Sequence, residues 1–429
     1  MKKKVLIITY YWPPAGGPGV QRLLKFVKYL PDFDIEPIVY IPENPNYPIV
    51  DVQLISEVNP NTIILKNKIS EPYKLAVFFS KKSTNTISSG IIPNKKKQSF
   101  LDKFLLYIRG NFFIPDARVG WVKPSVSCLE DYLKANPVDL IITTGPPHSL
   151  HLIGLELKKK LNCKWFADFR DPWTTIGYHK ELKLTQTSQE KHLQLESEVL
   201  NVADHILVTS PTTKKEFSKL TTKPISVITN GYDVEYIEKN PMDSKFSIAH
   251  IGSFLSDRNP RIFWKALSEL IKENKDFKQD FELKLIGKVS QEILDVISEF
   301  KLSNYLNNLG YLSHKEALVE QKSSQVLLLV EINSDETVGI IPGKLFEYMA
   351  AERPILAIGP EDADFAQIIK ETNSGTFFTY DQKDEVKEQI VKLYDSYKQN
   401  ELKVYAMGLQ YYSRKKLTEK LANIIKNEA

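Results

Sequence analysis

Short apolar runs rich in β-branched residues alternate with amphipathic stretches along almost the whole chain. Continuous apolar runs separated by helical patterns are typical of a parallel sheet that helices cover on both faces. The pattern therefore predicts an α/β protein with doubly wound parallel sheets. The expected strands are residues 5–9, 37–41, 62–65, 139–143, 165–169, 205–209, 225–229, 246–252, 281–287, 325–330, 353–358 and 375–380.

These strands fall into two series, one on each side of a polar segment at residues 230–245. The segment, "NGYDVEYIEKNPMDSK", contains Asn-Gly and Asn-Pro pairs, which favour turns. A chain of 429 residues is also too long for one ordinary core. We therefore expect two Rossmann-like domains, at residues 1–235 and 246–410, with ligands bound in a cleft beyond the carboxyl ends of their strands. The basic amphipathic stretch at 411–429 either closes the second domain or crosses back to the first.

The composition excludes several classes of protein. Apolar residues make up 42% and charged residues 26%, as in soluble globular chains. A net charge of +4 argues against a dedicated nucleic-acid binder. Cys128 and Cys163 lack paired spacing, which favours a reducing compartment without structural zinc. Since no apolar run approaches the roughly 20 residues that span a bilayer, we expect a cytoplasmic protein, with contact at the inner face of the membrane left open.

The stretch "GIIPGKLFEYMAAERPI" at residues 339–355 is a glycine-rich turn that opens a helix. Pro342 suits the first helical position, and the amides of residues 339–344 would then point at a diphosphate. Lys344 adds a point charge for phosphate oxygens, and Glu347, on the same face, would accept hydrogen bonds from sugar hydroxyls. The alternative is a surface Lys344–Glu347 pair that contributes little. The other expected donor contacts in this stretch are Gly339, Ile340, Pro342 and Gly343.

A second glycine loop, "YYWPPAGGPGVQR" at residues 10–22, follows the first strand and opens a helix. Gly16 and Gly17 allow a ligand to approach the backbone closely, and the helix start beyond them favours an anion. The alternative is a tight strand-to-helix turn without a ligand. Neither this loop nor the one at 339–344 has the spacing of a dinucleotide fingerprint, so a dinucleotide-dependent oxidoreductase is the least favoured enzyme.

Two further strand ends carry polar side chains. The segment "TTGPPHSLH" delivers His148 just before a helix, where it is either a site residue or only a helix-start residue. The segment "ADFRDPWT" at 167–174 ends another strand, and its polar residues either face the ligand or form a structural Asp–Arg network. The candidates in this segment are Asp168, Arg170, Asp171 and Trp173.

With these motifs in view, the chain resembles the retaining glycosyltransferases of the GT-B fold and is similar to glycosyltransferase family 4. The resemblance covers nearly the whole chain. It rests on the two glycine-loop stretches, "ADFRDPW", "TNGYD" and "HIGSFLSDRNP" (250–260). It implies two Rossmann-like domains facing across a cleft, with a nucleotide-sugar donor held by the C-terminal domain and the acceptor by the N-terminal one. It also implies catalysis without a metal and without a cofactor other than the donor substrate.

The resemblance assigns roles to single residues. Glu347 matches the second glutamate of the family's paired motif, and Arg258 matches a basic residue that contacts the diphosphate. Gly16 and Gly17 match glycines near the donor phosphate and the acceptor. Two positions depart from the family, because Gly339 stands where the first glutamate is expected and Ser253 where an arginine is expected. Lys344 would replace the lost charge, and His148 lies a few residues from the position of the catalytic histidine in many members.

The function that these matches imply is retaining transfer of a sugar from a nucleotide diphosphate to a glycan or lipid-linked acceptor, as in surface-polysaccharide synthesis. The leaving phosphate would be stabilised electrostatically and would itself take the acceptor proton. One alternative is a nucleotide-sugar epimerase of the same fold. Another is a non-catalytic protein that binds sugar nucleotides or membranes.

An insertion at about residues 43–123 interrupts the alternation of strands and helices. Lysines and phenylalanines together favour an acceptor surface or peripheral contact with anionic headgroups, and the alternative is a solvated loop. The residues concerned are Lys81 and Lys82, the segment "NKKKQ", and Phe78, Phe79, Phe100, Phe104, Phe112 and Phe113.

Overall fold

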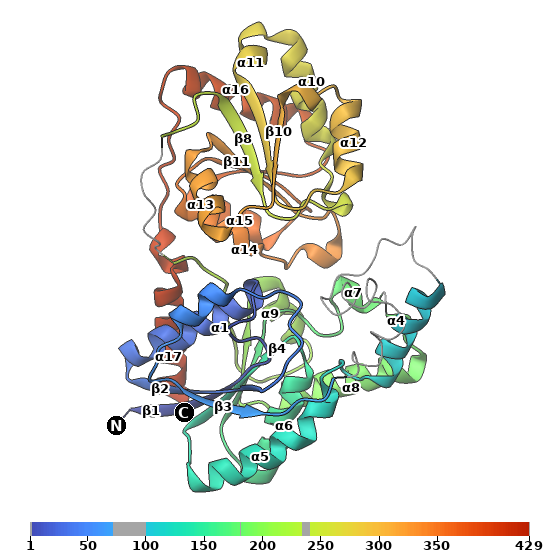
Figure 1. Ribbon diagram of the computed structural model, residues 1–429, viewed down its shortest axis with the longest axis vertical. Helices are drawn as coiled ribbons and strands as arrows, with labels where there is room; N and C mark the ends of the chain where they lie inside the picture. Colours follow the sequence, from blue (N-terminus) through green and yellow to red (C-terminus); the bar gives the residue numbers. More distant parts are fainter. Residues whose placement is uncertain (1, 72–99, 181, 234–240, 429) are drawn as a thin grey trace. The chain divides into compact units, whose positions relative to one another are not determined.

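The structure is a computed structural model that describes residues 2–71, 100–180, 182–233 and 241–428. The chain divides into two compact units, residues 1–229 together with 414–429, and residues 230–413. Each unit is an α/β domain built on one parallel sheet (Figure 1). The predicted fold class is thereby confirmed.

The first unit contains a seven-stranded sheet in the order β3-β2-β1-β4-β5-β6-β7, and every neighbouring pair is parallel. The central strands are buried along their length, which explains why their sequences are mostly apolar. The strands are β1 (Lys3–Ile8), β2 (Ile35–Pro42), β3 (Ile63–Asn67), β4 (Leu140–Gly145), β5 (Trp165–Phe169), β6 (His205–Val208) and β7 (Ile225–Val227).

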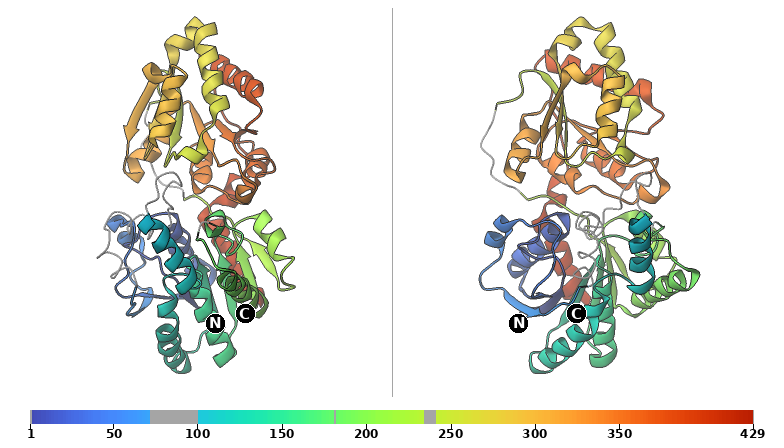
Figure 2. Two further views of the ribbon diagram at one scale, coloured as in Figure 1. Left: turned by 90° about the vertical axis from the view of Figure 1, so that its right-hand side faces the viewer. Right: turned by 45° about the vertical axis from the view of Figure 1, so that its right-hand side comes forward.

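Helices cover both faces of this sheet (Figure 2). On one face, α1 (Pro18–Tyr29) packs with α17 (Arg414–Glu428), whose Leu417, Leu421 and Ile425 are buried there. The C-terminal helix therefore belongs to the first unit. The opposite face is covered mainly by α5 (Val122–Ala135), α6 (Ser149–Leu161), α8 (Gln186–Val202) and α9 (Pro211–Phe217). The shorter or peripheral helices are α4 (Phe100–Phe112), α7 (Gly177–Lys180), η1 (Leu30–Phe33), η2 (Val52–Glu57) and η4 (Val119–Trp121).

The second unit contains a six-stranded parallel sheet in the order β10-β9-β8-β11-β12-β13. One of its strands, β10 (Leu306–Gly310), was not predicted, because its sequence LNNLG is too polar to stand out. It is an edge strand that pairs with β9 alone and stays partly exposed, so it needs no continuous apolar run. The others are β8 (Phe246–Ile251), β9 (Phe281–Ile286), β11 (Val326–Val330), β12 (Ile355–Ile358) and β13 (Gly375–Phe378).

Two helical layers cover this second sheet as well. One layer consists of α10 (Arg261–Glu273), α11 (Lys275–Asp280), α12 (Gln291–Glu299) and α16 (Lys383–Lys398). The other includes α14 (Gly343–Ala350) and α15 (Asp364–Thr372), with α13 (His314–Ser323) beside them (Figure 1). The short 3₁₀ helices are η5 (Ser256–Arg258), η6 (Ser303–Tyr305), η7 (Asp335–Thr337) and η8 (Leu409–Tyr412).

The strand orders locate one switch point in each sheet, where neighbouring strands lead into connections that run in opposite directions. It lies between β1 and β4 in the first unit and between β8 and β11 in the second. Ligands of open α/β sheets bind outside the carboxyl ends of the strands at such points. The loops that follow these four strands are therefore where a site is expected.

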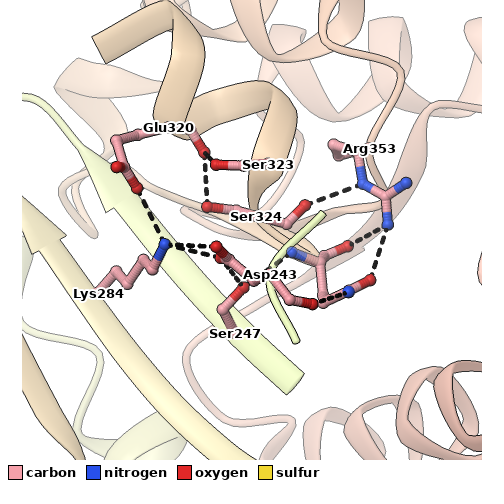
Figure 3. Close-up of polar contacts among 8 residues, drawn as sticks. Asp243, Ser247, Lys284, Glu320, Ser323, Ser324 and Arg353 are labelled. Atoms are coloured by element: carbon pink, nitrogen blue, oxygen red, sulfur yellow. Dashed lines mark hydrogen bonds and ion pairs between the residues drawn. The ribbon is translucent and has the colours of Figure 1, made fainter. Parts of the chain in front are cut away.

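Near the other end of the second sheet, a polar network joins the segments that precede β8, β11 and β12 (Figure 3). Lys284 of β9 contacts Asp243 at 2.7 Å and Glu320 of α13 at 2.9 Å. Arg353 donates to the carbonyls of Ser324 at 2.9 Å and Gln325 at 3.1 Å. Each charged side chain in this network has an ion-pair or hydrogen-bond partner. The network therefore holds the starts of the strands together.

The insertion is only partly described. Phe78, Phe79, Lys81, Lys82 and the "NKKKQ" segment lie outside the described residues. Within α4, Phe104 and Phe112 are exposed. Among the described residues, no helix combines the length and the apolar character needed to span a bilayer.

Candidate functional site

The start of α14 lies in the second unit and presents its backbone amides without a side-chain cap. Pro342 is the N-cap residue rather than the first helical residue, and the helix begins at Gly343. An ideal Cβ at Gly343 would meet no heavy atom within 4 Å, so the space beside this turn is open. The first turn contains no acidic side chain. The helix dipole and the absence of a side-chain cap together favour an anion there.

Lys344 lies in this first turn, and its ammonium turns toward the end of β8. Lys344 Nζ is 3.3 Å from Nε2 of His250, a residue of β8. An ideal Cβ at Gly252 would lie 3.0 Å from the same Nζ, so the glycine leaves room for the lysine. Lys344 thus contacts His250 rather than Glu347, and the simple surface pair weighed as an alternative does not form.

Arg258 supplies a second cation from η5. Its Nη2 and Nε lie 2.9 Å and 3.0 Å from Oε1 of Glu331, the residue that follows β11. The same oxygen accepts from the Ile332 amide at 2.8 Å. Glu331 is fully buried, whereas the Arg258 side chain keeps 26% of its surface exposed. The pair therefore anchors Arg258 while one side of its guanidinium remains accessible.

Burial and the neighbouring Arg258 affect the ionisation of Lys344. Burial, followed by the nearby positive charge of Arg258, lowers the pKa of Lys344 to about 8. Glu331 and Glu347 oppose the shift but do not cancel it. An approaching phosphate would reverse the shift, because it brings the opposite charge that the unliganded site lacks.

Glu347 lies one turn further along α14. Its Oε2 accepts from Gln321 Nε2 of α13 at 3.1 Å, and its Oε1 lies 3.4 Å from Nε2 of His314. The carboxylate remains 31% exposed, so it can accept further hydrogen bonds. Ser253 is exposed just after β8, and Gly339 and Ile340 are partly buried in the segment leading to α14. Among the described residues, no group of His, Cys, Asp and Glu side chains could hold a metal ion.

In the first unit, the glycine loop follows β1 at its carboxyl end. Gly17 has φ +92°, which L side chains rarely adopt, and it is the N-cap of α1. Gly16 donates from its amide to the carbonyl of Ile49 at 3.0 Å. An ideal Cβ at Gly19 would lie 2.3 Å from Nη1 of Arg170, so this glycine lets the Arg170 guanidinium pack against the start of α1.

Asp168, at the end of β5, takes part in a structural network. It forms a buried ion pair with Arg22 of α1 at 2.8 Å and accepts from Thr144 at 2.9 Å. Arg22 also donates to the carbonyls of Ile228 and Thr229. Asp168 is therefore part of a structural Asp–Arg network, which was the alternative to direct ligand contact. Its partner is Arg22 rather than Arg170. This pair ties α1 to the end of β5.

His148 is the N-cap residue of α6 and is buried. Its ring stacks on Trp173 with centroids 5.0 Å apart, and neither ring nitrogen has a hydrogen-bond partner among the described residues. Burial, then the neighbouring His151 and Arg170, hold the pKa of His148 well below its usual value, so the ring is neutral. Such an unpaired buried imidazole is uncommon, which makes His148 a candidate for a functional role.

Trp173 of the "ADFRDPWT" segment stacks on this histidine, and Arg170 and Asp171 precede it in the same loop. Arg170 donates to the Pro146 carbonyl, and its guanidinium lies over the Tyr11 ring at 5.9 Å. Burial raises the pKa of Asp171 despite the opposing charge of Arg170. Trp173 donates from its indole to His192 at 3.1 Å, which fixes its ring under His148.

Three residues of the second unit were not predicted as site residues from the sequence: His250, Glu331 and Gln321. Glu331 could have been found, because it is the first polar residue after the apolar run of β11. His250 lies inside an apolar run and gave no signal of its own. Gln321 is buried on a helix of mixed polarity, and its Oε1 has no partner among the described residues.

Comparisons with known proteins agree with this arrangement. The family model described as Glycosyltransferase Family 4 matches residues 92–236, and the model described as Glycosyl transferases group 1 matches residues 245–396. No curated protein sequence matches the chain.

Solved structures resemble the whole chain at low identity. Sucrose-phosphate synthase from Thermosynechococcus elongatus is 14% identical, with TM-score 0.58 and coverage of 99% of this chain and 98% of that one. S. aureus TarM, as a mutant in complex with Fondaparinux, alpha-GlcNAc-glycerol and UDP, is 12% identical, with TM-score 0.55 and coverage of 99% of both chains. A putative UDP-N-acetylglucosamine 2-epimerase from Listeria monocytogenes is 13% identical, with TM-score 0.57 and coverage of 100% and 96%.

Because these structures are at most 14% identical to the chain, they establish its fold alone. The family models connect its sequence to glycosyltransferases. The strand orders of both sheets, the two family matches and the shared architecture agree. The chain therefore belongs to the GT-B-fold glycosyltransferases and is similar to glycosyltransferase family 4.

Proposed function

We propose that this protein transfers a sugar, with retention of anomeric configuration, from a nucleotide diphosphate sugar to a hydroxyl of a glycan or lipid-linked acceptor. The observation that carries the proposal is the pair of cations at the uncapped start of α14. Lys344 lies in the uncapped first turn of this helix, and Arg258 lies near Lys344, close to the switch point between β8 and β11. A diphosphate is the ligand whose charge and size suit such a site.

In this proposal, donor recognition divides along α14. The diphosphate lies against the amides at the helix start, next to Lys344 and Arg258. The ribose hydroxyls donate to Glu347, whose carboxylate Gln321 already orients. Backbone groups of Ser253, Gly339, Ile340, Pro342 and Gly343 complete the donor contacts.

The chemistry requires charge stabilisation more than proton transfer by a side chain. As the bond from the sugar carbon to the phosphate oxygen breaks, negative charge grows on the diphosphate and positive charge on the sugar. Lys344, Arg258 and the helix amides stabilise the leaving group, and the departing phosphate takes the proton of the acceptor hydroxyl. These two cations are the reason for proposing a reaction without a metal.

The first unit would supply the acceptor side. Gly16 and Gly17 allow close approach of the donor phosphate and acceptor. His148 is neutral with both ring nitrogens unengaged, so it can hydrogen-bond to the transferred sugar. Trp173 stacks on this histidine, and Arg170, Asp171 and Trp173 would line the acceptor side, while Asp168 supports this loop through Arg22.

A transfer assay tests the proposal. The protein is incubated with UDP-, GDP- and ADP-linked sugars, with and without glycerol or alkyl glycosides as acceptors. We expect nucleoside diphosphate release that depends on an acceptor, and a product whose anomeric configuration, read by proton NMR, matches that of the donor. Inversion of configuration would overturn the retaining mechanism.

The same assay separates the rival functions. An epimerase, favoured by the likeness to the Listeria structure, would interconvert free nucleotide sugars without any acceptor. A non-catalytic binder would show a rise in melting temperature with nucleoside diphosphates and no turnover. Either result would replace the transferase assignment.

A lipid-linked acceptor would bring the protein into contact with the inner face of the cell membrane. The exposed Phe104 and Phe112 of α4 are the described residues that support this contact. Flotation with liposomes of anionic lipid measures it. Replacing both phenylalanines with serine should abolish flotation, and unchanged flotation of that variant would contradict this surface.

A further inference from the structure

His250 is a buried, titratable side chain that the proposed chemistry does not yet use. It lies in β8, one residue before the end of the strand, and has no solvent exposure. Its ring stacks on Phe254 with centroids 4.1 Å apart. Both ring nitrogens are engaged, Nδ1 with the Leu328 carbonyl at 3.0 Å and Nε2 with Lys344 Nζ at 3.3 Å.

These two contacts determine which nitrogen of His250 carries the proton. A carbonyl oxygen only accepts, so Nδ1 must be protonated and donate to Leu328. Nε2 then presents a lone pair, which accepts from the Lys344 ammonium. Burial, then the neighbouring positive charge of Lys344, hold the pKa of His250 well below its usual value, although hydrogen bonds to the backbone of Leu328 and Ser253 oppose the shift. This direction is in keeping with a neutral ring.

A neutral hydrogen-bond acceptor can hold the Lys344 ammonium without cancelling its charge. A carboxylate in contact with Lys344 would hold the ammonium equally well, but it would cancel the charge that a diphosphate needs. Glu331 lies nearby and is occupied by Arg258, and Glu347 is held by Gln321. Among the described residues, Lys344 Nζ has a single hydrogen-bond partner, His250, and no carboxylate within 4.0 Å.

Gly252 completes the slot that holds the lysine. It adopts φ +113°, and an ideal Cβ there would lie 3.0 Å from Nζ and 3.3 Å from Cε of Lys344. The end of the lysine therefore crosses the glycine backbone at the carboxyl end of β8. The ammonium therefore has both the His250 ring and the Gly252 backbone as neighbours.

We propose that His250 is a positioning residue for the diphosphate site: its unprotonated Nε2 holds the Lys344 ammonium at the carboxyl end of β8 while leaving the full positive charge available to the ligand. This inference rests on the proposed function, because the ligand of Lys344 is taken to be the donor diphosphate. It assigns His250 no contact with the donor. Its whole effect passes through Lys344.

Two variants remove the acceptor in different ways. His250→Asn can still donate to the Leu328 carbonyl but has no atom at the place of Nε2. His250→Phe keeps the ring volume and the stacking on Phe254 but loses both hydrogen bonds. His250→Gln is the matched rescue, since its side chain is long enough to place a neutral acceptor near Lys344.

The experiment is a double-mutant cycle with Lys344→Met, read by calorimetric titration of UDP, GDP and ADP. We expect His250→Asn and His250→Phe to weaken binding of the nucleoside diphosphate about 10-fold in the presence of Lys344. In the Lys344→Met background, the same changes should have less than about a 2-fold effect. His250→Gln should bind within about 3-fold of the unmodified protein.

Each outcome is decisive. Full affinity in the variants that lack the acceptor, or equal losses with and without Lys344, would overturn the positioning role while leaving the proposed function intact. Failure of the unmodified protein to bind any of the three nucleotides would overturn the proposed function, and this inference with it. If one acceptor-lacking variant fails to fold, as judged by its melting curve, the other variant and the glutamine rescue still give the comparison.

Discussion

Two lysines of the second unit, Lys284 and Lys344, are buried and partly buried respectively, and they differ in the charges that surround them. Lys284 of β9 contacts two carboxylates, those of Asp243 and Glu320, within 2.9 Å (Figure 3). Lys344 of α14 contacts a neutral imidazole and lies near the cation Arg258. Burial lowers both pKa values, but hydrogen bonds to the carboxylates outweigh it and raise the pKa of Lys284, whereas the pKa of Lys344 falls to about 8.

The difference separates a structural charge from a functional one. Lys284 is already neutralised, so a ligand would gain little by binding it. Lys344 carries a charge whose partner is missing, and an incoming anion would supply that partner. The sheet thus uses one buried cation to join strand starts and keeps the other available at the strand ends.

Lys344→Met should have the largest effect of the changes considered. Removing a preorganised cation from the leaving group should lower the transfer rate about 10²–10³-fold, with a change of less than about 1 kcal/mol in the free energy of unfolding. Steady-state kinetics and a denaturant titration measure the two quantities. The control is Lys392→Met, which removes an exposed lysine of α16 and should leave both unchanged. A rate within a few-fold of normal would remove Lys344 from the site.

Lys284→Met should show the opposite pattern. It leaves the carboxylates of Asp243 and Glu320 without their cation, at side-chain exposures of 17% and 25%. We expect a loss of about 2–3 kcal/mol in the free energy of unfolding and normal affinity for nucleoside diphosphates at temperatures where the protein is folded. Weakened nucleotide binding in the folded variant would show that the two lysines are not separate in function.

Gly252→Ala changes the slot of Lys344 without altering any charge. The left-handed φ of +113° and the 3.0 Å approach to Nζ should cost about 1–2 kcal/mol of stability, and displacement of the ammonium should weaken nucleotide binding about 5-fold. Gly408→Ala is the matched control, since Gly408 has φ +67° and its nearest contact is the ring of Tyr411. It should lower stability in a similar way and leave affinity unchanged. Equal affinities of the two variants would argue against a role for the slot.

The sequence contained most of the fold, for a physical reason. Strands buried on both faces are mostly apolar, so β4, β8, β11 and β12 stood out from their neighbours. The edge strand β10 did not, because exposure lets it keep two asparagines. The order of strands in each sheet depends on crossover connections that a single sequence does not display.

The parts of the candidate site whose residues are close together in the sequence could be predicted. Helical spacing placed Lys344 and Glu347 on one face of α14, and the glycine-proline turn indicated an uncapped helix start. The partners of these residues come from other elements. His250 is 94 positions from Lys344, and Gln321 is 26 from Glu347, so their contacts follow from packing of β8 and α13 against α14. No local pattern could have predicted them.

The pH dependence of the two lysines provides the last test, and here affinity and stability should change in opposite directions. Four groups face Lys344: His250 from β8, Arg258 from η5, Glu331 after β11 and Glu347 on α14. In the free protein Lys344 loses its proton near pH 8, so affinity for a nucleoside diphosphate should fall up to about 10-fold per pH unit above that value. Over the same range the unfolded chain still binds that proton, its lysine pKa being about 10.4, so this residue's contribution to stability rises with pH.

Lys284 should contribute nothing to either change in this window. Because its folded pKa is raised, its ion pairs are fully present below the unfolded value of about 10.4 and are lost only as the pH rises through the folded pKa. Calorimetric titrations between pH 7 and 9.5, in buffers of different ionisation enthalpy, would detect proton uptake on nucleotide binding. Lys344→Met should remove that uptake, and Lys284→Met should retain it. Proton uptake that persists without Lys344 would assign the titration to another group and end the contrast between the two lysines.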